Sequence, residues 1–175
     1  ESNIPVLEGS GTDTLLDINV RARAKYGSNN YLESNIKQWL NSESPSFKWE
    51  PKNIYGRPSI GTPYTGGGFL NLLDPELVAV IGAVDKQVAK NTTTDGGGQD
   101  LFNDKVFLLS RVEVGFGTEG VTIGEAVYPY YDGISNAGRI KLLNGSPRSW
   151  WLRSATVDDS SLARFVYTTG GLYHY

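Results

Sequence analysis

The side chains that come closest to catalytic chemistry are the adjacent carboxylates Asp158 and Asp159 and the distant pair Glu33 and Asp104. Glycoside hydrolysis uses such a pair, one as acid and the other as base or nucleophile. Neighbouring aspartates in a polar loop are more often solvated turn residues. The chain has no Cys, and its single His, His174, is the penultimate residue, where chains usually fray. We therefore expect no catalytic residues and no enzymatic activity.

Two loops have sequences that resemble ion-binding or nucleotide-binding motifs. Residues 91–100 are rich in side-chain oxygen atoms, which suit calcium, but they lack the alternating acidic ligands of an EF-hand loop. A solvated polar loop is the better interpretation, and calcium binding over 91–104 stays open. Residues 115–120 read GxGxxG, but the segment after them is too short to be the helix that a dinucleotide site requires. The sequence predicts no cofactor and no metal.

The tyrosine side chains are the third candidate group, and their chemistry suits ligand recognition. Tyr gives a large amphipathic contact area at low entropic cost, and neighbouring Ser, Gly and Asn add adaptable hydrogen bonds, as in antibody paratopes. Each tyrosine taken singly is more often a packing residue of its own loop. Seven of them lie mainly among Gly, Ser, Thr and Asp and together favour a recognition surface: Tyr64, Tyr128, Tyr130, Tyr131, Tyr167, Tyr173 and Tyr175.

The composition is that of one folded domain. The chain has 175 residues, of which 39% are hydrophobic, and a net charge of -3, so we expect neither a nucleic-acid partner nor a membrane one. Residues 1–13 are polar and aperiodic and are expected to form an arm or linker, with the domain over 14–175. Because the chain neither begins with Met nor shows a signal peptide, we expect a processed product or an excerpt.

Two helices are expected to support the loops. Apolar residues at helical spacing over 31–42, among them Trp39, predict the first helix, with a cap in the turn cluster before it. Asp74 can cap the second helix, and Pro75 suits its first position. Its predicted buried face runs to Val88 and comprises Leu77, Val80, Ile81, Val84 and Val88.

A strand-like segment is expected from Leu15 to Tyr26, and strands are expected over 105–110 and in three antiparallel segments near the end of the chain. The first of these three contains Trp150 and Trp151, which point to opposite faces, so a central strand covered on both sides is predicted. Arg153 is expected to be paired or at the rim, because an unpaired buried guanidinium is costly. Residues 43–68 read as an irregular loop with Trp49 and Tyr55 as anchors. The predicted class is α+β: two helices packed on a small, twisted, mainly antiparallel sheet.

The segments NYLESNIKQWLNS (30–42), DKVFLLS (104–110), WWLRS (150–154) and RFV (164–166) with Gly170-Gly171 give the chain a resemblance to a bacterial and phage family. Members of that family resemble C-type-lectin-fold domains, and the resemblance covers about residues 26–175. The tyrosine-rich tail is further similar to variable proteins that are diversified by retroelements. In those proteins the strands stay fixed while exposed residues vary. The family continues into a further strand, so we expect the display surface to be incomplete at Tyr175.

The resemblance implies a role for each matching position. The scaffold would consist of Trp39, Trp150, Trp151, Leu152 and Arg153. The ligand-binding surface would consist of Tyr130, Tyr131, Thr156, Asp158, Asp159, Tyr167, Tyr173, His174 and Tyr175.

The leading hypothesis is a non-catalytic recognition domain on a virion, or at the extracellular surface of a bacterium, that binds a host-surface protein or glycan. The alternative is a structural virion domain for decoration or assembly. Its partners would be capsid or tail subunits, or copies of itself in a homo-oligomer.

Overall fold

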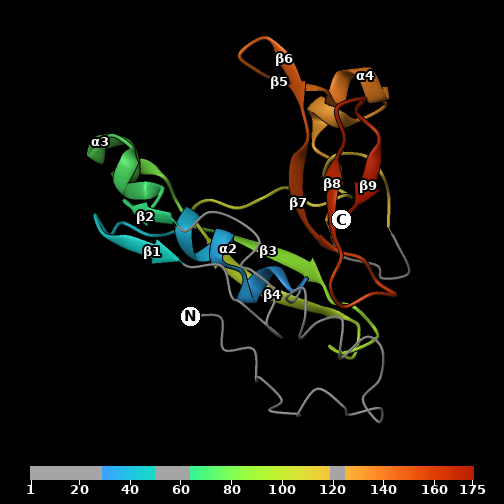
Figure 1. Ribbon diagram of the computed structural model, residues 1–175, viewed down its shortest axis with the longest axis horizontal. Coiled ribbons are helices and arrows are strands. Elements are labelled where there is room, and N and C mark those ends of the chain that lie inside the picture. The colour runs from blue at the N-terminus through green and yellow to red at the C-terminus, as the bar shows by residue number, and fades with distance from the viewer. Residues whose placement is uncertain (1–28, 50–63, 119–124) are drawn as a thin grey trace.

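A computed structural model describes residues 29–49, 64–118 and 125–175 of the chain (Figure 1). Several expected features lie outside the described residues: the N-terminal arm over 1–13, the strand-like segment over 15–26, Tyr55, the side chain of Trp49 and the end of the GxGxxG segment. Within the described ranges, no helix has the length and apolar character needed to span a membrane.

The described part of the chain is α+β, with short helices and small antiparallel sheets. The helical elements are η1 (Tyr31–Glu33), α2 (Asn35–Leu40), η2 (Leu70–Leu72), α3 (Pro75–Val80), η3 (Pro129–Tyr131) and α4 (Asn136–Arg139). Three hairpins pair β1 (Phe47–Trp49) with β2 (Tyr64–Gly66), β3 (Val84–Ala89) with β4 (Gln99–Asp104), and β5 (Lys141–Leu143) with β6 (Ser146–Arg148). The fourth sheet has the order β7-β8-β9, formed by β7 (Trp150–Ala155), β8 (Ala163–Val166) and β9 (Leu172–His174).

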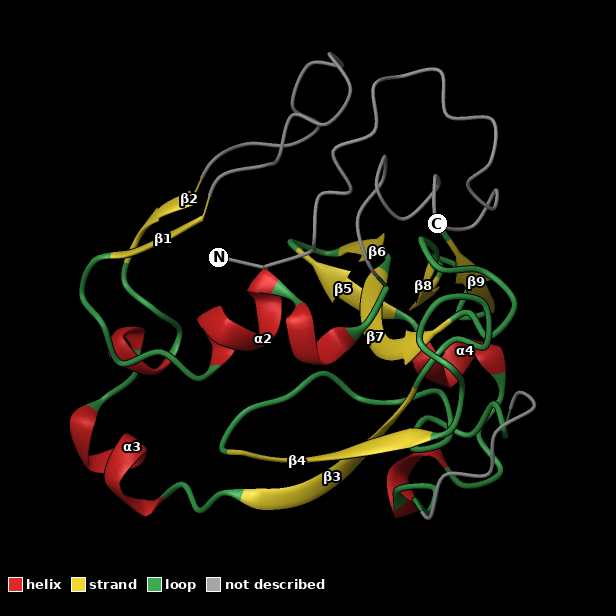
Figure 2. Cartoon of the chain, turned by 90° about the horizontal axis from the view of Figure 1, so that it is seen from below, coloured by secondary structure: helices red, strands yellow, loops and turns green. Residues whose placement is uncertain are grey.

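The elements form two parts that β3 and β4 connect. In Figure 1, β1, β2 and α3 form an arm on the left, and α4 with the strands β5 to β9 forms an upright lobe on the right. The β3–β4 hairpin runs from the side of the arm toward the lobe, and the view from below shows the same arrangement (Figure 2). From here on, "the arm" means β1, β2 and α3, not the N-terminal segment 1–13, and "the lobe" means α4 with β5 to β9.

The helix expected over 31–42 is divided at Ser34. Asn30 caps η1 by accepting a hydrogen bond from the Leu32 backbone N–H at 3.0 Å, as the turn cluster before it predicted. Ser34 then adopts an extended backbone, and its hydroxyl accepts a hydrogen bond from the Lys37 N–H at 3.2 Å, which begins α2. The serine therefore serves as the cap of a second helical segment, a role that its side chain favours over the middle of a helix.

The helix predicted over 74–88 is wrong in its extent. Asp74 does cap it, accepting from the Glu76 N–H at 2.8 Å, but the helix ends at Val80 and exposes its apolar side chains. Val84 and Val88 lie instead in β3, where Val88 pairs with Asp100 of β4 and is buried. Gly82 weakens the helix, and β-branched valines suit the pleated strand, so pairing with a remote strand overrides the helical spacing.

The strand predicted over 105–110 is also wrong, because β4 ends at Asp104. The following segment satisfies its backbone through other parts of the chain. The Arg153 guanidinium donates to the Leu108 carbonyl at 2.6 Å, and the Arg153 backbone N–H donates to the Leu109 carbonyl at 3.0 Å. The Leu108 N–H donates to the Tyr31 hydroxyl at 3.3 Å. Buried backbone groups need hydrogen-bond partners. Here the Arg153 side chain supplies a donor that a neighbouring strand would otherwise have supplied.

Two hydrophobic cores hold the described residues. One lies under β7 and β8 and centres on Val114, Tyr131, Leu152 and Val166. The other joins η1 to the β3–β4 hairpin and centres on Tyr31, Val88 and Phe102.

The strand β7 is at the edge of its sheet and β8 is at the centre, so the prediction of a central strand at 149–154 is wrong. The face that carries Trp150 is packed, and the Trp150 indole N–H donates to the Arg139 carbonyl at 3.1 Å. Trp151 on the other face is half exposed.

The loop over 91–100 is built around a buried side chain, which differs from the predicted solvated loop. The Asn91 amide oxygen accepts hydrogen bonds from the backbone N–H groups of Thr93 and Thr94, at 3.2 and 2.8 Å. Its amide N–H donates to Asn29 at 2.9 Å, and Asn29 in turn donates to three carbonyls of the turn over 156–162. This chain of amides fixes the turn between β7 and β8 to the rest of the molecule.

Burial of Tyr31 predicts a loss of stability in alkali. Burial raises the pKa of Tyr31 to about 12, and the nearby charge of Asp104 adds to the rise. The unfolded chain would release this proton near pH 10, so the unfolded state gains stability between pH 10 and 12. We expect the free energy of unfolding to fall by about 2 kcal/mol over this window. Urea unfolding at pH 8, 10, 11 and 12 measures it. The Tyr31→Phe variant should show a shallower decline, and an equal decline would contradict the assignment.

Candidate functional site

The strands β7, β8 and β9 carry large aromatic side chains on one face of their sheet. In the antiparallel register Trp151 lies opposite Phe165, which lies opposite Tyr173. Side chains alternate between the faces of a strand, so the neighbouring residues point the other way and pack around the fully buried Val166. Tyr167 lies two residues after Phe165 and shares its face. We call Trp151, Phe165, Tyr167 and Tyr173 the aromatic face.

The rings of the aromatic face form one continuous cluster. Phe165 is at its centre, with ring centroids 5.3 Å from Trp151, 6.3 Å from Tyr167 and 6.2 Å from Tyr173. Tyr167 and Tyr173 also contact each other at 5.0 Å. The interplanar angles range from 35° to 67°, so the rings meet at an angle and give a corrugated surface. Such tilted pairs stabilise each other and hold the cluster in place.

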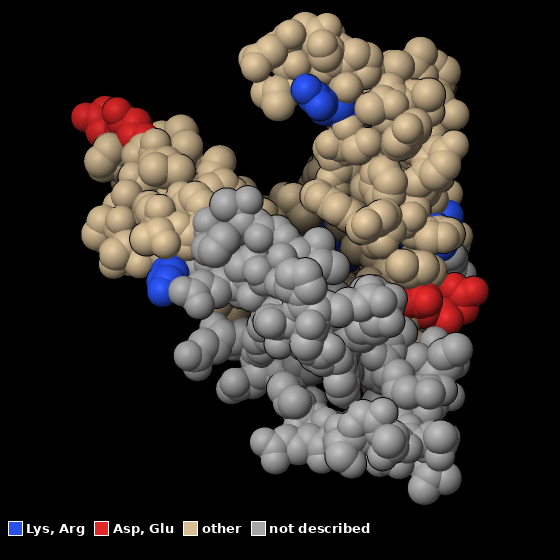
Figure 3. Space-filling model, in the orientation of Figure 1, with Lys and Arg blue, Asp and Glu red and all other residues tan. Residues whose placement is uncertain are grey.

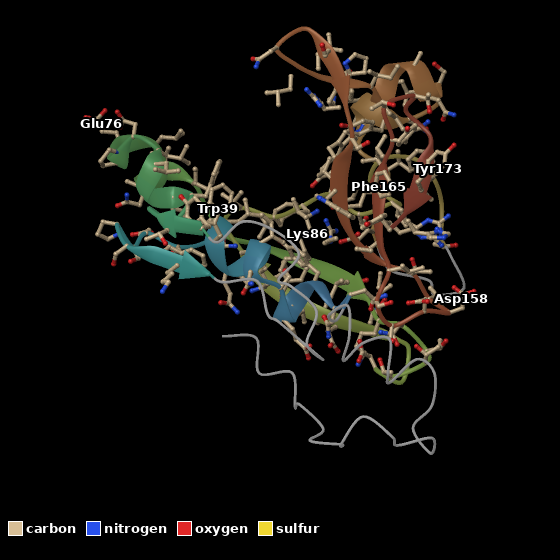
Figure 4. The ribbon with its side chains drawn as sticks, in the orientation of Figure 1. Trp39, Glu76, Lys86, Asp158, Phe165 and Tyr173 are labelled. Atoms are coloured by element: carbon tan, nitrogen blue, oxygen red, sulfur yellow. The ribbon has the colours of Figure 1, made fainter. Side chains whose placement is uncertain are left out.

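Much of the aromatic face is open to solvent. Trp151 is 49% exposed, Tyr167 42% and Tyr173 51%. The hydroxyl groups of Tyr167 and Tyr173 make no hydrogen bond to another described residue, so both are available to a ligand. Figure 4 places Phe165 and Tyr173 side by side on the lobe, and the lobe shows few charged side chains in Figure 3.

A tight turn between β8 and β9 positions the two tyrosines. The Tyr167 N–H donates to the Gly171 carbonyl, and the Gly170 N–H donates to the Tyr167 carbonyl, both at 2.8 Å. Gly170 has a φ of +81°, and a Cβ placed there would lie 1.7 Å from the Asn136 carbonyl oxygen. Only glycine fits both the backbone conformation and the contact with α4.

The predicted ligand-binding residues do not all share one surface. Tyr167, Tyr173 and Tyr175 are exposed on or beside the aromatic face. Tyr130 is exposed near η3, where Lys141 lies 5.0 Å from its ring centroid. His174 points to the opposite face of β9 from Tyr173, and its Nδ1 lies 2.9 Å from the Arg164 guanidinium.

Two of the predicted ligand-binding residues are buried, which corrects the sequence-based assignment. Tyr131 belongs to the core under β7 because η3 turns its ring inward. Thr156 is 3% exposed, below the turn that Asn29 holds. Asp159 accepts from the Ser161 N–H at 2.7 Å and so orders this turn, whereas Asp158 is exposed beside it.

The predicted scaffold residues also fall into two groups, those that are packed inside the fold and one, Trp151, that is exposed. Leu152 and Arg153 are buried, and Trp39 joins α2 to the arm through a 3.1 Å hydrogen bond from its indole N–H to the Gly67 carbonyl. Trp151 belongs to the aromatic face because the sheet ends at β7 and nothing among the described residues covers its ring fully. Phe165, at the centre of that face, was missed as a site residue. Its spacing from Tyr167 in a strand was the signal that could have identified it.

A buried ionic network lies beside the aromatic face. Arg153 is paired, as expected: its guanidinium contacts Glu113 at 2.6 Å and also contacts Glu125. Lys86 donates to the other oxygen of Glu113 at 2.7 Å and to the Tyr128 hydroxyl at 2.9 Å. The sequence indicated that Arg153 needs a partner but could not identify the carboxylates, which lie 40 and 28 residues away in the chain.

The charged groups of this network keep one another ionised. Burial by itself raises the pKa of Glu113, but hydrogen bonds and charges from Arg153 and Lys86 outweigh burial and hold the pKa below its ordinary value. Burial likewise lowers the pKa of Lys86, but Glu113 and Tyr128 more than offset that effect and raise the pKa. Both groups therefore stay ionised at neutral pH. Such paired networks mainly fix structure, although Glu125 Oε2 is buried without a hydrogen bond to another described residue.

The described ranges contain no cluster of side chains that could bind a metal ion. Among residues 29–49, 64–118 and 125–175, no three His, Asp or Glu side chains gather in a way that could hold a metal ion. Of the carboxylate pair Glu33 and Asp104, Asp104 is buried and bound to Lys37 at 3.2 Å.

The fold and the surface thus define an α+β protein whose most distinctive exposed feature is a cluster of aromatic rings. The chain belongs to the family described as "Domain of unknown function (DUF6273)", whose profile matches residues 11–175. No curated protein and no solved structure matches it.

Proposed function

We propose that this chain is a non-catalytic recognition domain with a C-type-lectin-like scaffold, and that the aromatic face binds a host-surface protein or glycan. A phage particle or a bacterial surface is the setting that the family resemblance favours. The observation that carries the proposal is the contiguous set of exposed rings on β7, β8 and β9.

The energetics of exposed aromatic rings support binding at this face. Burying a large apolar side chain contributes about 1.5–3 kcal/mol, and Tyr and Trp recur at the centres of interfaces. Single exposed apolar residues are common on proteins, but contiguous patches often mark an interaction site. Three neighbouring rings that are each about half exposed form such a patch.

The rigid support under the face strengthens the case. The rings are fixed by a strand register, by contacts with one another and by the turn at Gly170. A surface that is ordered before binding loses little conformational entropy when the ligand arrives. The free hydroxyl groups of Tyr167 and Tyr173 would supply direction through hydrogen bonds.

The test begins with a ligand search and continues with a matched pair of variants. An array of bacterial-surface glycans and a displayed peptide library are probed with the intact chain. For a ligand so obtained, the double variant Tyr167→Ser and Tyr173→Ser should weaken binding about 10- to 100-fold. The double variant loses ring contacts with Phe165, but both tyrosines are about half exposed and neither hydroxyl bonds to another described residue, so the fold should persist, which circular dichroism can verify.

The control is Leu101→Ser, which removes an even more exposed apolar side chain from β4. Its affinity for the ligand should match that of the unaltered chain. Unchanged binding by the double variant would contradict the proposal. So would turnover of any substrate that disappears when one carboxylate is replaced.

A further inference from the structure

Two exposed apolar patches lie outside the aromatic face. The arm patch consists of Leu72, Leu77 and Val80, at the end of η2 and on α3, and Val80 is 77% exposed. The hairpin patch is on β5, where Leu142 and Leu143 are both more than half exposed and point to opposite faces of the hairpin. Exposed apolar side chains on projecting elements suit contact with another protein surface.

Charges of opposite sign accompany the two patches. Asp74 and Glu76 are exposed at the start of α3, and Lys141 and Arg148 are exposed on the β5–β6 hairpin. In the space-filling view, a red group lies at the end of the arm and a blue group on the upper part of the lobe, on the two sides of a hollow (Figure 3). Figure 4 labels Glu76 at the end of the arm. The α3 end of the arm is therefore acidic and apolar, and the hairpin is basic and apolar.

One molecule cannot bring its own two patches together. The arm and the hairpin stand apart on opposite sides of the β3–β4 connection (Figure 1). The hairpin is also held in place. The hairpin closes with a tight turn at Asn144 and Gly145, whose φ values are +53° and +77°, and Lys141 lies over the rings of Tyr130 and Tyr131 at 5.0 and 5.5 Å.

We propose that these patches bind a second copy of this chain, so that the arm of each protomer packs against the β5–β6 hairpin of the other. A two-fold axis makes the same contact twice and leaves no patch open, which favours a closed dimer over a filament. The complementary charges would orient the arm on the hairpin, while the apolar side chains would supply most of the binding free energy. This inference does not depend on the aromatic face.

Sedimentation velocity of the intact chain over a series of concentrations tests the proposal. We expect a reversible monomer–dimer equilibrium that ends at the dimer. Val80→Asp, a substitution of a side chain that touches little within the protomer, should weaken the dimer at least about tenfold. A monomer at every concentration would contradict the proposal, and so would growth into larger species.

Exchanging charges by mutation tests whether the arm of one protomer contacts the hairpin of the other. Glu76→Arg and Arg148→Glu should each weaken association about fivefold, and the double variant should return to within about twofold of the unaltered chain. The matched control is Asp158→Arg, the same type of charge change on an exposed loop of the lobe that lies away from the arm (Figure 4). It should leave association unchanged. Single variants without effect, or a double variant that is weaker than either single one, would overturn the pairing of arm and hairpin.

Discussion

Replacement of Arg153 by Met should lower the free energy of unfolding by about 3–5 kcal/mol. The guanidinium is fully buried and contacts both Glu113 and Glu125. It also donates to the Gln87 carbonyl at 3.0 Å and to the Leu108 carbonyl at 2.6 Å. Without it, Glu125 loses its charged partner, and two partly buried carbonyls lose a donor. Glu113 keeps Lys86 and the Ser110 N–H as partners.

Urea unfolding followed by tryptophan fluorescence measures this loss. The matched control is Arg148→Met, which removes the same charge from an exposed position on β6 and should change stability by less than about 0.5 kcal/mol. A loss below about 1 kcal/mol for Arg153→Met would show that the network is not a major source of stability.

Replacement of Gly170 by Ala should cost about 3 kcal/mol or more, because strain and a backbone clash act together. The residue has a φ of +81°, and the new Cβ would lie 1.7 Å from the Asn136 carbonyl oxygen. Either the β8–β9 turn or α4 must move. Since the turn holds Tyr167 and Tyr173, their exposure and contacts should change as well.

Gly145→Ala separates the two causes. Gly145 has a φ of +77°, but a Cβ there would meet nothing within 4 Å, so only the backbone strain of about 1 kcal/mol should appear. Thermal or urea unfolding of both variants gives the comparison. Equal losses would indicate that the contact between Gly170 and Asn136 yields easily.

Local signals in the sequence predicted the parts of the fold that depend on neighbouring residues. Asn30 and Asp74 cap helical elements, and Pro75 occupies the first turn of α3, as their types indicated. The three antiparallel strands at the end of the chain are confirmed, since glycine and polar turns separate their apolar runs. The need of Arg153 for a partner followed from the cost of an unpaired buried charge.

Long-range contacts decided what the sequence could not predict. Val84 and Val88 fit a helical stripe, but pairing with β4 placed them in a strand. Tyr131 was predicted at the surface with Tyr130, yet η3 sends one ring into the core and the other outward. The same limit applies to the candidate site. The exposed tyrosines of the tail were identified, but the place of Trp151 beside them depends on which strand forms the edge of the sheet.

The measurement that tests the aromatic face most directly is hydroxyl-radical footprinting of the intact chain with and without the ligand found by the array or the library. The account predicts that the ligand protects Trp151, Tyr167 and Tyr173 from oxidation and leaves Leu101 and Val80 unaffected. Protection of another surface, with these three rings oxidised at the same rate in the free and the bound chain, would contradict it.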